Sequence, residues 1–324
     1  MSRYHGIYAT LIEQYISFKQ NLGYKFVDAI YTYSLFDRFT IEKGVTTIGV
    51  TKELADEWAI KRPNESDSTC YKRVFYLAQL SAFLNDTGYP SYIPRLPKAY
   101  RSTFTPYIFS KKELEAIFIA CDKLVETNGN MNSSINVIPA LFRVLYGTGI
   151  RIGEAVALKN RDVYLEDSYF IIKDSKNGKE RMVPLSGSLV QVCKQYRASL
   201  SGIYAAGEYF FVKRNGQKCS SKAVYEWFRK ALRNANIPHG GKGKGPRLHD
   251  FRHAFSVYSL VSMADAGLDL YYSLPILSTY LGHQSLEATD RYVRLTSEMF
   301  PGLLSEVNSI CAYVFPEVSR PEAD

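Results

Sequence analysis

Apolar residues recur at helical spacing through the first hundred positions of the chain. They predict four α-helices, over residues 8–22, 30–41, 51–60 and 71–84. Gly23, Gly44 and Pro63 fall between these stretches, where helices commonly end. The pattern therefore predicts a small helical domain over residues 1–87.

A proline-rich segment follows at residues 88–107. It carries Pro90, Pro94, Pro97 and Pro106. Proline lacks the N–H group that a helix interior needs, so we expect an extended linker here. Ser110 and Glu113 then have the spacing of a capping box, which predicts that a helix, and a second domain, begin at this point.

The second domain mixes helical periods with short alternating stretches. Helices are predicted over residues 137–145, 152–158, 222–234 and 251–262. Strands are predicted over 169–173 and 182–185, joined by a hairpin turn at Asn177-Gly178, with a third strand over 209–212. The expected fold is mainly α with a small antiparallel β-sheet, an α+β class.

The basic charge is concentrated in one segment. The chain has a net charge of +8, and from Lys213 to Arg252 eleven basic residues stand against two acidic ones. Such a segment fits a nucleic acid partner, and it equally fits a lysine-rich solvated surface. The candidates for DNA contact are Lys213, Arg214, Lys242, Lys244 and Arg247.

Other features narrow the class of protein. No stretch of 18 apolar residues predicts a membrane span, and the N-terminus lacks the apolar region of a signal peptide. The five cysteines are scattered and never form a CxxC pair, so we expect a reducing, cytoplasmic setting. A metal site built from His249, His253 and His283 is not expected, because we expect neither the i, i+4 pair nor the carboxylate partner of common zinc sites among them.

Several segments could hold an anion or move a proton. Arg151 follows a Thr-Gly turn at a predicted helix start, where a phosphate would be favoured, and Glu154 could brace it. The same pair could equally be an ordinary surface ion pair. His249 and Arg252 form an H-x-x-R pattern that places both side chains on one face of a helix.

Three more candidates are weak when taken singly. Lys176 lies on the predicted hairpin, between Lys173 and Lys179, where a lysine could protonate a leaving oxygen or simply be solvated. His283 and Tyr292 stand nine residues apart in LGHQSLEATDRYVRL, although Tyr292 is one of 25 tyrosines. His253, beside Arg252, is taken as incidental.

The order of these segments is more specific than any one of them. TGIRIGEAVAL, KNGKERMVPL, LHDFRHAFS and LGHQSLEATDRYVRL resemble, in that order, the boxes of the tyrosine recombinase family of the phage integrase type. The resemblance spans residues 108–295. One departure is the 34-residue separation of His249 and His283, whose extra length falls in residues 262–275 as a longer loop or helix.

The resemblance implies a role for each matching position. Tyr292 is similar to the family's nucleophile, while Arg151 and Arg252 resemble the arginines that hold the nonbridging phosphate oxygens. His249 resembles the histidine that assists proton transfer, and Lys176 the general acid on the 5′ oxygen. His283 resembles the residue that hydrogen-bonds the scissile phosphate, and Glu154 the support of the first arginine.

The resemblance also implies a domain organisation. Residues 1–87 would be a core-binding, SAM-like domain, 88–107 a linker and 108–297 the catalytic domain. In the tail, residues 298–324, apolar positions recur at helical spacing from Phe300 to Val314. A tail helix could pack on its own domain, or, as in the family, dock on a neighbouring subunit.

The implied function is site-specific recombination of double-stranded DNA through a 3′-phosphotyrosyl intermediate. The enzyme would integrate, excise or resolve a mobile element as a homotetramer on DNA, with accessory proteins and without metal, ATP or another cofactor. A type IB topoisomerase-like relaxing enzyme, an idle DNA-binding protein on the same fold and an RNA-binding module are the alternatives.

Overall fold

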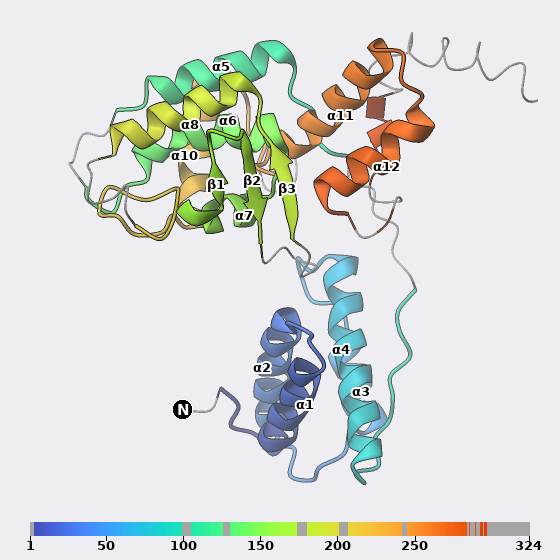
Figure 1. Cartoon of the computed structure of the whole chain (residues 1–324). Coiled ribbons are helices and arrows are strands. Elements are labelled where there is room, and N and C mark those ends of the chain that lie inside the picture. The colour runs from blue at the N-terminus through green and yellow to red at the C-terminus, as the bar shows by residue number, and fades with distance from the viewer. Residues whose placement is uncertain are drawn as a thin grey trace, which may run out of the picture. The chain divides into compact units, whose positions relative to one another are not determined.

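The computed structural model describes residues 3–98, 105–125, 130–173, 180–200, 207–241, 245–283, 285, 289, 292–293 and 295–296. The chain divides into two compact units, Met1–Phe104 and Thr105–Asp324 (Figure 1). Lys176, Lys179, Lys242, Lys244 and the tail from residue 297 onward lie outside the described residues.

The first unit is built from four helices, at the places where the apolar pattern predicts them. They are α1 (Ala9–Asn21), α2 (Val27–Glu42), α3 (Lys52–Ala59) and α4 (Asp67–Asp86). The side chains of Thr51 and Ser66 accept hydrogen bonds from backbone N–H groups in the first turns of α3 and α4, so both helices have a defined start. Aromatic rings fill the core, among them Tyr8, Tyr33, Phe36 and Trp58.

The first part of the predicted linker is attached to this unit. The backbone N–H of Tyr92 donates to the carbonyl of Val50 at 2.7 Å. The side chain of Asn85 at the end of α4 exchanges two hydrogen bonds with the backbone of Ser91. Residues up to Tyr92 are therefore held against the helices, while the predicted domain boundaries themselves stay a prediction.

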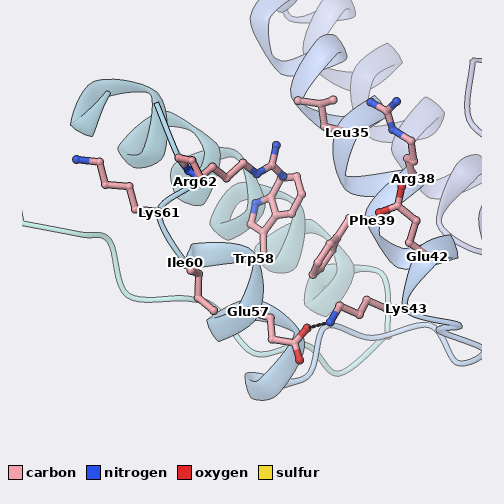
Figure 2. A pocket seen from close by; sticks show the side chains of 11 residues that line it. Leu35, Arg38, Phe39, Glu42, Lys43, Glu57, Trp58, Ile60, Lys61 and Arg62 are labelled. Carbon is pink, nitrogen blue, oxygen red and sulfur yellow. Dashed lines mark ion pairs between the residues drawn. The ribbon is translucent and has the colours of Figure 1, made fainter. Parts of the chain in front are cut away.

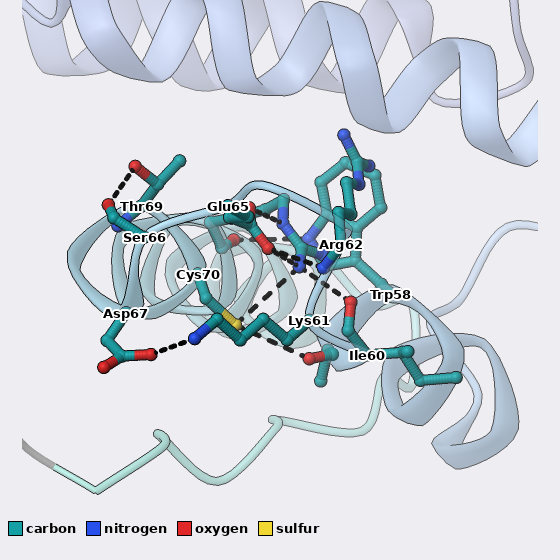
Figure 3. Close-up of polar contacts among 11 residues, drawn as sticks. Trp58, Ile60, Lys61, Arg62, Glu65, Ser66, Asp67, Thr69 and Cys70 are labelled. Carbon is teal, nitrogen blue, oxygen red and sulfur yellow. Dashed lines mark hydrogen bonds and ion pairs between the residues drawn. The ribbon is translucent and has the colours of Figure 1, made fainter. Parts of the chain in front are cut away.

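Trp58 lies at the centre of a charged network. Its ring is flanked by the guanidinium groups of Arg62 and Arg73, at 4.9 and 5.0 Å from the ring centroid. Arg73 makes a two-pronged ion pair with Glu65, both bonds 2.9 Å long, and also donates to the carbonyl of Ile60 (Figure 3). The network ties the α3–α4 connection to both helices.

A pocket of about 720 Å³ lies beside the same tryptophan. Leu35, Arg38 and Phe39 of α2 line it together with Glu57, Trp58 and Arg62 (Figure 2). An ion pair between Lys43 and Glu57, 2.5 Å long, joins the end of α2 to α3 at its edge.

Replacing Arg73 with methionine is expected to lower the free energy of unfolding of the first unit by about 3–5 kcal/mol, because Glu65 would stay buried without its partner. The pair is deeply enclosed, with the side chains 4% and 7% exposed. Urea unfolding followed by Trp58 fluorescence, in a Trp227→Phe background, measures this change.

The matched control is Lys52→Met, which removes the exposed pair of Lys52 with Asp56. That change should cost no more than about 1 kcal/mol. Equal losses in the two variants would contradict the buried-pair argument.

The second unit holds the remaining helices and the sheet. The helices are α5 (Lys111–Asp122), α6 (Ile138–Thr148), α7 (Ile152–Ala157), α8 (Gly187–Ser199), α10 (Ser221–Asn234), α11 (Asp250–Asp265) and α12 (Leu270–Leu281), with 3-10 turns at Ile135–Val137 and Asn160–Asp162. The capping box of Ser110 and Glu113 begins α5, which confirms that prediction. The longer 262–275 segment is taken up by the end of α11 and the start of α12.

The sheet has three antiparallel strands in the order β1-β2-β3. These are β1 (Val163–Tyr164), β2 (Tyr169–Ile172) and β3 (Arg181–Pro184), with Phe170 opposite Val183 in the register. The predicted third strand at 209–212 is wrong, because only isolated bridges occur at Tyr209 and Val212. The true third strand, β1, has two residues and is too short to show an alternating pattern.

Helix α11 connects two parts of this unit. It contacts α6 on one side and α12 on another, and α12 in turn contacts β3 (Figure 1). The ring of Phe251 packs against those of Phe109, Phe142 and Phe228. The first turn of α11, which carries Arg252 and His253, is thereby fixed by the core. Among the described residues, no helix is long and apolar enough to cross a membrane.

Candidate active site

The position of Arg151 is set by the turn at which helix α6 ends. Helix α6 stops at Gly149, whose φ of 61° is left-handed. A side chain there would also collide with Phe255, because an added Cβ would lie 2.4 Å from its ring. Glycine therefore allows the chain to turn here, and Arg151 becomes the N-cap residue, immediately before the first residue of α7.

Glu154 holds two arginines at once. One of its oxygens lies 2.9 Å from Nη1 of Arg151, and the other accepts from Nη2 of Arg181 at 2.7 Å. Burial disfavours its charge, yet hydrogen bonds from Arg181 and Arg151 keep the pKa of Glu154 below its ordinary value. The pair of Arg151 with Glu154 is therefore part of a buried network, not an isolated surface pair.

Arg181 was not singled out in the sequence. It stands at the start of β3, and its Nε donates to the backbone carbonyl of Tyr280 at 2.9 Å. A Cβ added to Gly282 would lie 3.2 Å from its guanidinium, so the chain passes closely over it. Arg181 links the first arginine to the end of α12, a contact across 99 positions that local pattern does not reveal.

Arg252 is buried in the same region, with 2% of its surface exposed. Its guanidinium donates to the carbonyls of Gly149 and Leu281, both at 2.7 Å. Burial and the nearby charge of Arg151 lower the pKa of Arg252 to about 10, which leaves it cationic at neutral pH. This side chain joins the end of α6, the start of α11 and the end of α12.

His249 precedes α11 and borders the arginines. Its ring meets that of His253 edge-on, with centroids 4.7 Å apart. Surrounding protein and the charges of Arg252, Arg247 and Arg151 lower the pKa of His249 to about 4, although solvent still reaches the side chain. The imidazole is therefore neutral at physiological pH.

Tyr292 lies inside the protein, next to two histidines. Its hydroxyl oxygen is 2.9 Å from Nδ1 of His253, and its ring lies nearly parallel to that of His283, with centroids 6.2 Å apart. Nδ1 of His283 lies 2.7 Å from the hydroxyl of Thr289. The ring belongs to an apolar cluster with Val257, Leu260, Leu277, Leu281 and Leu295.

The structure thus gathers Arg151, Glu154, His249, Arg252, His283 and Tyr292 into one region. It adds Arg181 and His253, which the sequence interpretation passed over. His253 was set aside because a lone histidine beside an arginine carries no signal. Its partner, Tyr292, is 39 positions away, so only the fold brings the two together.

The described basic residues that were candidates for DNA contact or proton donation lie at several different places in the second unit. Lys173 makes an ion pair with Asp162 at 2.8 Å. Lys213 and Arg214 belong to a turn in which the backbone N–H of Lys213 donates to the carbonyl of Gln217. Arg247 lies in the site itself, where its guanidinium binds the Asp250 carboxylate at 3.1 Å.

His249 and His253 are four positions apart, so the expectation that these histidines lack an i, i+4 pair is wrong. Within the described part of the chain, however, no group of three metal-ligating side chains occurs.

A tyrosine hydroxyl beside arginines and histidines combines a nucleophile with cations and proton carriers, the groups that suit a reaction at a phosphate. The model of the Phage integrase family matches residues 108–299. The Sinorhizobium fredii protein y4rB, named as an integrase/recombinase, is 30% identical over 298 residues, 89% of this chain and 93% of that protein. The chain therefore belongs to the phage integrase family and is a tyrosine site-specific recombinase.

Other relatives agree with this. Tyrosine recombinase XerA of Pyrococcus furiosus is 28% identical over 192 residues, 56% of this chain and 61% of that protein. The structure of XerH recombinase bound to palindromic difH substrate has a TM-score of 0.62 at 19% identity, covering 87% of this chain and 79% of that one. The lambda integrase (75–356) dimer on a COC′ core site has a TM-score of 0.62 at 16% identity, covering 87% and 94%. At these identities the solved structures establish the likeness of fold, including the α+β class.

Proposed function

We propose that this recombinase cleaves and rejoins double-stranded DNA through a 3′-phosphotyrosyl intermediate on Tyr292, and that it integrates, excises or resolves a mobile element. The observation that supports this best is the position of Tyr292, which is buried beside His253 and lies in the same region as Arg252, His249 and His283. The position of Arg151 at a helix start beside Arg252 agrees with it.

The electrostatics suit attack on a phosphodiester. The transition state concentrates negative charge on the nonbridging oxygens, and Arg151 and Arg252 would stabilise it. Because both guanidiniums are already fixed by Glu154, Gly149 and Leu281, they need little rearrangement during the reaction. His249, neutral at physiological pH, can donate a hydrogen bond or carry a proton, and His283 would bind the scissile phosphate.

The 5′ oxygen is a poor leaving group and needs a proton donor. We propose Lys176 for this step, on the family resemblance, with His249 assisting. Lys176→Ala is expected to slow cleavage of an ordinary duplex by about 10²-fold or more. A duplex with sulfur in place of the bridging 5′ oxygen should be cleaved at nearly the normal rate, because a thiolate leaves without an acid.

Single-turnover rates on the two duplexes measure this. Lys173→Ala is the control, because Lys173 is paired with Asp162 and should leave both rates unchanged. A Lys176→Ala defect of equal size on both duplexes would exclude the general-acid role.

Several basic side chains would contact the DNA backbone. These are Lys213, Arg214, Lys242, Lys244 and Arg247, of which Arg247 borders a hollow of about 500 Å³ together with Arg229 and His249. Cationic side chains around a hollow next to the site would attract the phosphates that flank the cleavage point. The XerH and lambda integrase structures are complexes with DNA sites, which agrees with a duplex partner.

We further propose that the tail, residues 298–324, docks on a neighbouring subunit and links protomers into a tetramer on DNA. Deleting the tail is expected to reduce the yield of paired-site complexes by about tenfold, equivalent to roughly 1.4 kcal/mol of association free energy. Gel-shift assays with one site and with two sites separate DNA binding from site pairing. A truncated chain that recombines at full yield would show that the tail does not act in this way.

A plasmid with two copies of the recombination site tests the proposed function against its alternatives. A recombinase should produce two circles or an inverted segment, whereas a type IB topoisomerase-like enzyme would only relax supercoils. An idle DNA-binding protein would do neither. Relaxation without any exchange product would overturn the proposed function.

A further inference from the structure

His253 contacts the hydroxyl group that would form the bond to DNA. Its Nδ1 lies 2.9 Å from the Tyr292 oxygen, and both side chains are enclosed, with 4% and 2% of their surfaces exposed. The two rings are tilted by 51° with centroids 5.5 Å apart, so the imidazole meets the phenol at its hydroxyl end and not by stacking. A neutral imidazole nitrogen at this distance can accept the phenolic proton.

The opposite side of the imidazole faces a carboxylate. Nε2 of His253 lies 3.9 Å from Oδ1 of Asp250, which stands three residues earlier on α11. Asp250 is fully buried and fixed by Arg247, whose backbone N–H and guanidinium donate to its two oxygens at 2.7 and 3.1 Å. A positive charge on His253 would therefore form next to a positioned acidic group. Carboxylate, imidazole and hydroxyl follow one another in the order that activates nucleophiles in other enzymes, and here the carboxylate acts on the imidazole by charge at 3.9 Å and not through a hydrogen bond.

The tyrosine needs such an activator. A phenol with an ordinary pKa near ~10 is almost entirely protonated at neutral pH, and the protonated form is a poor nucleophile. His249 belongs to the same site, but its ring meets that of His253 edge-on, and burial and the positive charges of three nearby arginines lower its pKa. Nδ1 of His253 lies within hydrogen-bond distance of the tyrosine oxygen, at 2.9 Å.

We propose that His253 is the general base that takes the hydroxyl proton of Tyr292 during DNA cleavage. The inference rests on the proposed function and adds a residue to it. The O–H proton passes to Nδ1 of His253, the phenolic oxygen forms a bond to phosphorus, and the bond from phosphorus to the 5′ oxygen breaks. The leaving oxygen takes its proton from a different donor. In the rejoining step a 5′ hydroxyl attacks phosphorus and gives its proton back to the group that protonated the leaving oxygen. The bond from phosphorus to the tyrosine oxygen then breaks, and His253 returns its proton to that oxygen.

A duplex with a bridging 5′ sulfur isolates this proton transfer, because departure of the sulfur needs no acid. His253→Ala and His253→Asn are both expected to cleave it at least about 10²-fold more slowly than the unmodified chain. Asparagine keeps a polar atom near the position of Nδ1 but cannot take a proton. Rates are measured in a single turnover on DNA-bound protein, so that partial misfolding does not imitate a slow step. His5→Ala, in the first unit, is the matched histidine control.

A second measurement separates proton transfer from mere placement of the ring. Fluorotyrosine at position 292 ionises more readily, so it depends less on a base. The defect of His253→Asn should become smaller in that background, and a structural defect would not.

Three results would overturn the proposal. Full activity in His253→Asn would mean that His253 only positions the ring, and faster cleavage in His253→Ala would mean that it restrains the tyrosine. Normal rates in both variants would exclude any role. In each case the unmodified chain still forms the covalent adduct. Absence of that adduct in the unmodified chain would instead refute the proposed function.

Discussion

Tyr292→Phe is expected to abolish the covalent DNA adduct completely. The phenolic oxygen is the atom that would bond to phosphorus, and loss of a catalytic nucleophile costs on the order of 10⁶ in rate in a protease. The ring itself should stay in place, because it is packed against Leu277 and Leu281. A nicked suicide duplex that carries the recombination site, run on a denaturing gel after incubation with the protein, measures the adduct.

Tyr280→Phe is the matched control. Tyr280 lies in the same unit, its ring stacks on Phe255 with centroids 5.5 Å apart, and burial raises the pKa of Tyr280 to about 12. Its hydroxyl should therefore stay protonated and take no part in the reaction, and the adduct should form as usual. An adduct that persists in Tyr292→Phe would show that another group attacks the phosphate. If Tyr292→Phe binds DNA normally, the missing adduct is due to the missing hydroxyl group and not to a failure to bind DNA.

The fold could be predicted where the pattern of one segment decides its structure. The four helices of the first unit follow from their apolar spacing, and the start of α5 follows from the capping box of Ser110 and Glu113. Helix α8 is absent from the predicted elements, although its buried positions, Leu189, Val190, Cys193 and Tyr196, stand at helical spacing. Strand β1 was missed because two residues carry no periodicity, and its pairing with β2 decides its structure.

The site could be predicted where residue type and chain order carry the signal. Arg151, His249, Arg252, His283 and Tyr292 stand in segments that resemble the family boxes, and the fold brings them into one region. Arg181 and His253 act through contacts that span 99 and 39 positions. Nothing near either residue in the sequence indicates its partner, so a three-dimensional structure is required to find them.

Arg252→Lys is expected to reduce cleavage by about 10² to 10³-fold although the positive charge is kept. The guanidinium holds the carbonyls of Gly149 and Leu281 through two different nitrogens, and its other N–H groups remain for the phosphate. A lysine carries its charge on one nitrogen and cannot span both carbonyls while it binds an oxygen of the substrate. The rate constant for adduct formation, at saturating protein, measures the effect.

Arg143→Lys is the matched control for this change. Arg143 also makes a two-pronged contact, with the Asp122 carboxylate at 2.8 and 2.7 Å, but the pair is partly exposed. Its replacement should change stability by no more than about 1 kcal/mol and leave cleavage unchanged. If Arg252→Lys cleaved as fast as Arg143→Lys, charge alone would be sufficient at position 252. The forked geometry that joins the end of α6 to α11 and α12 would then serve the fold and not the chemistry.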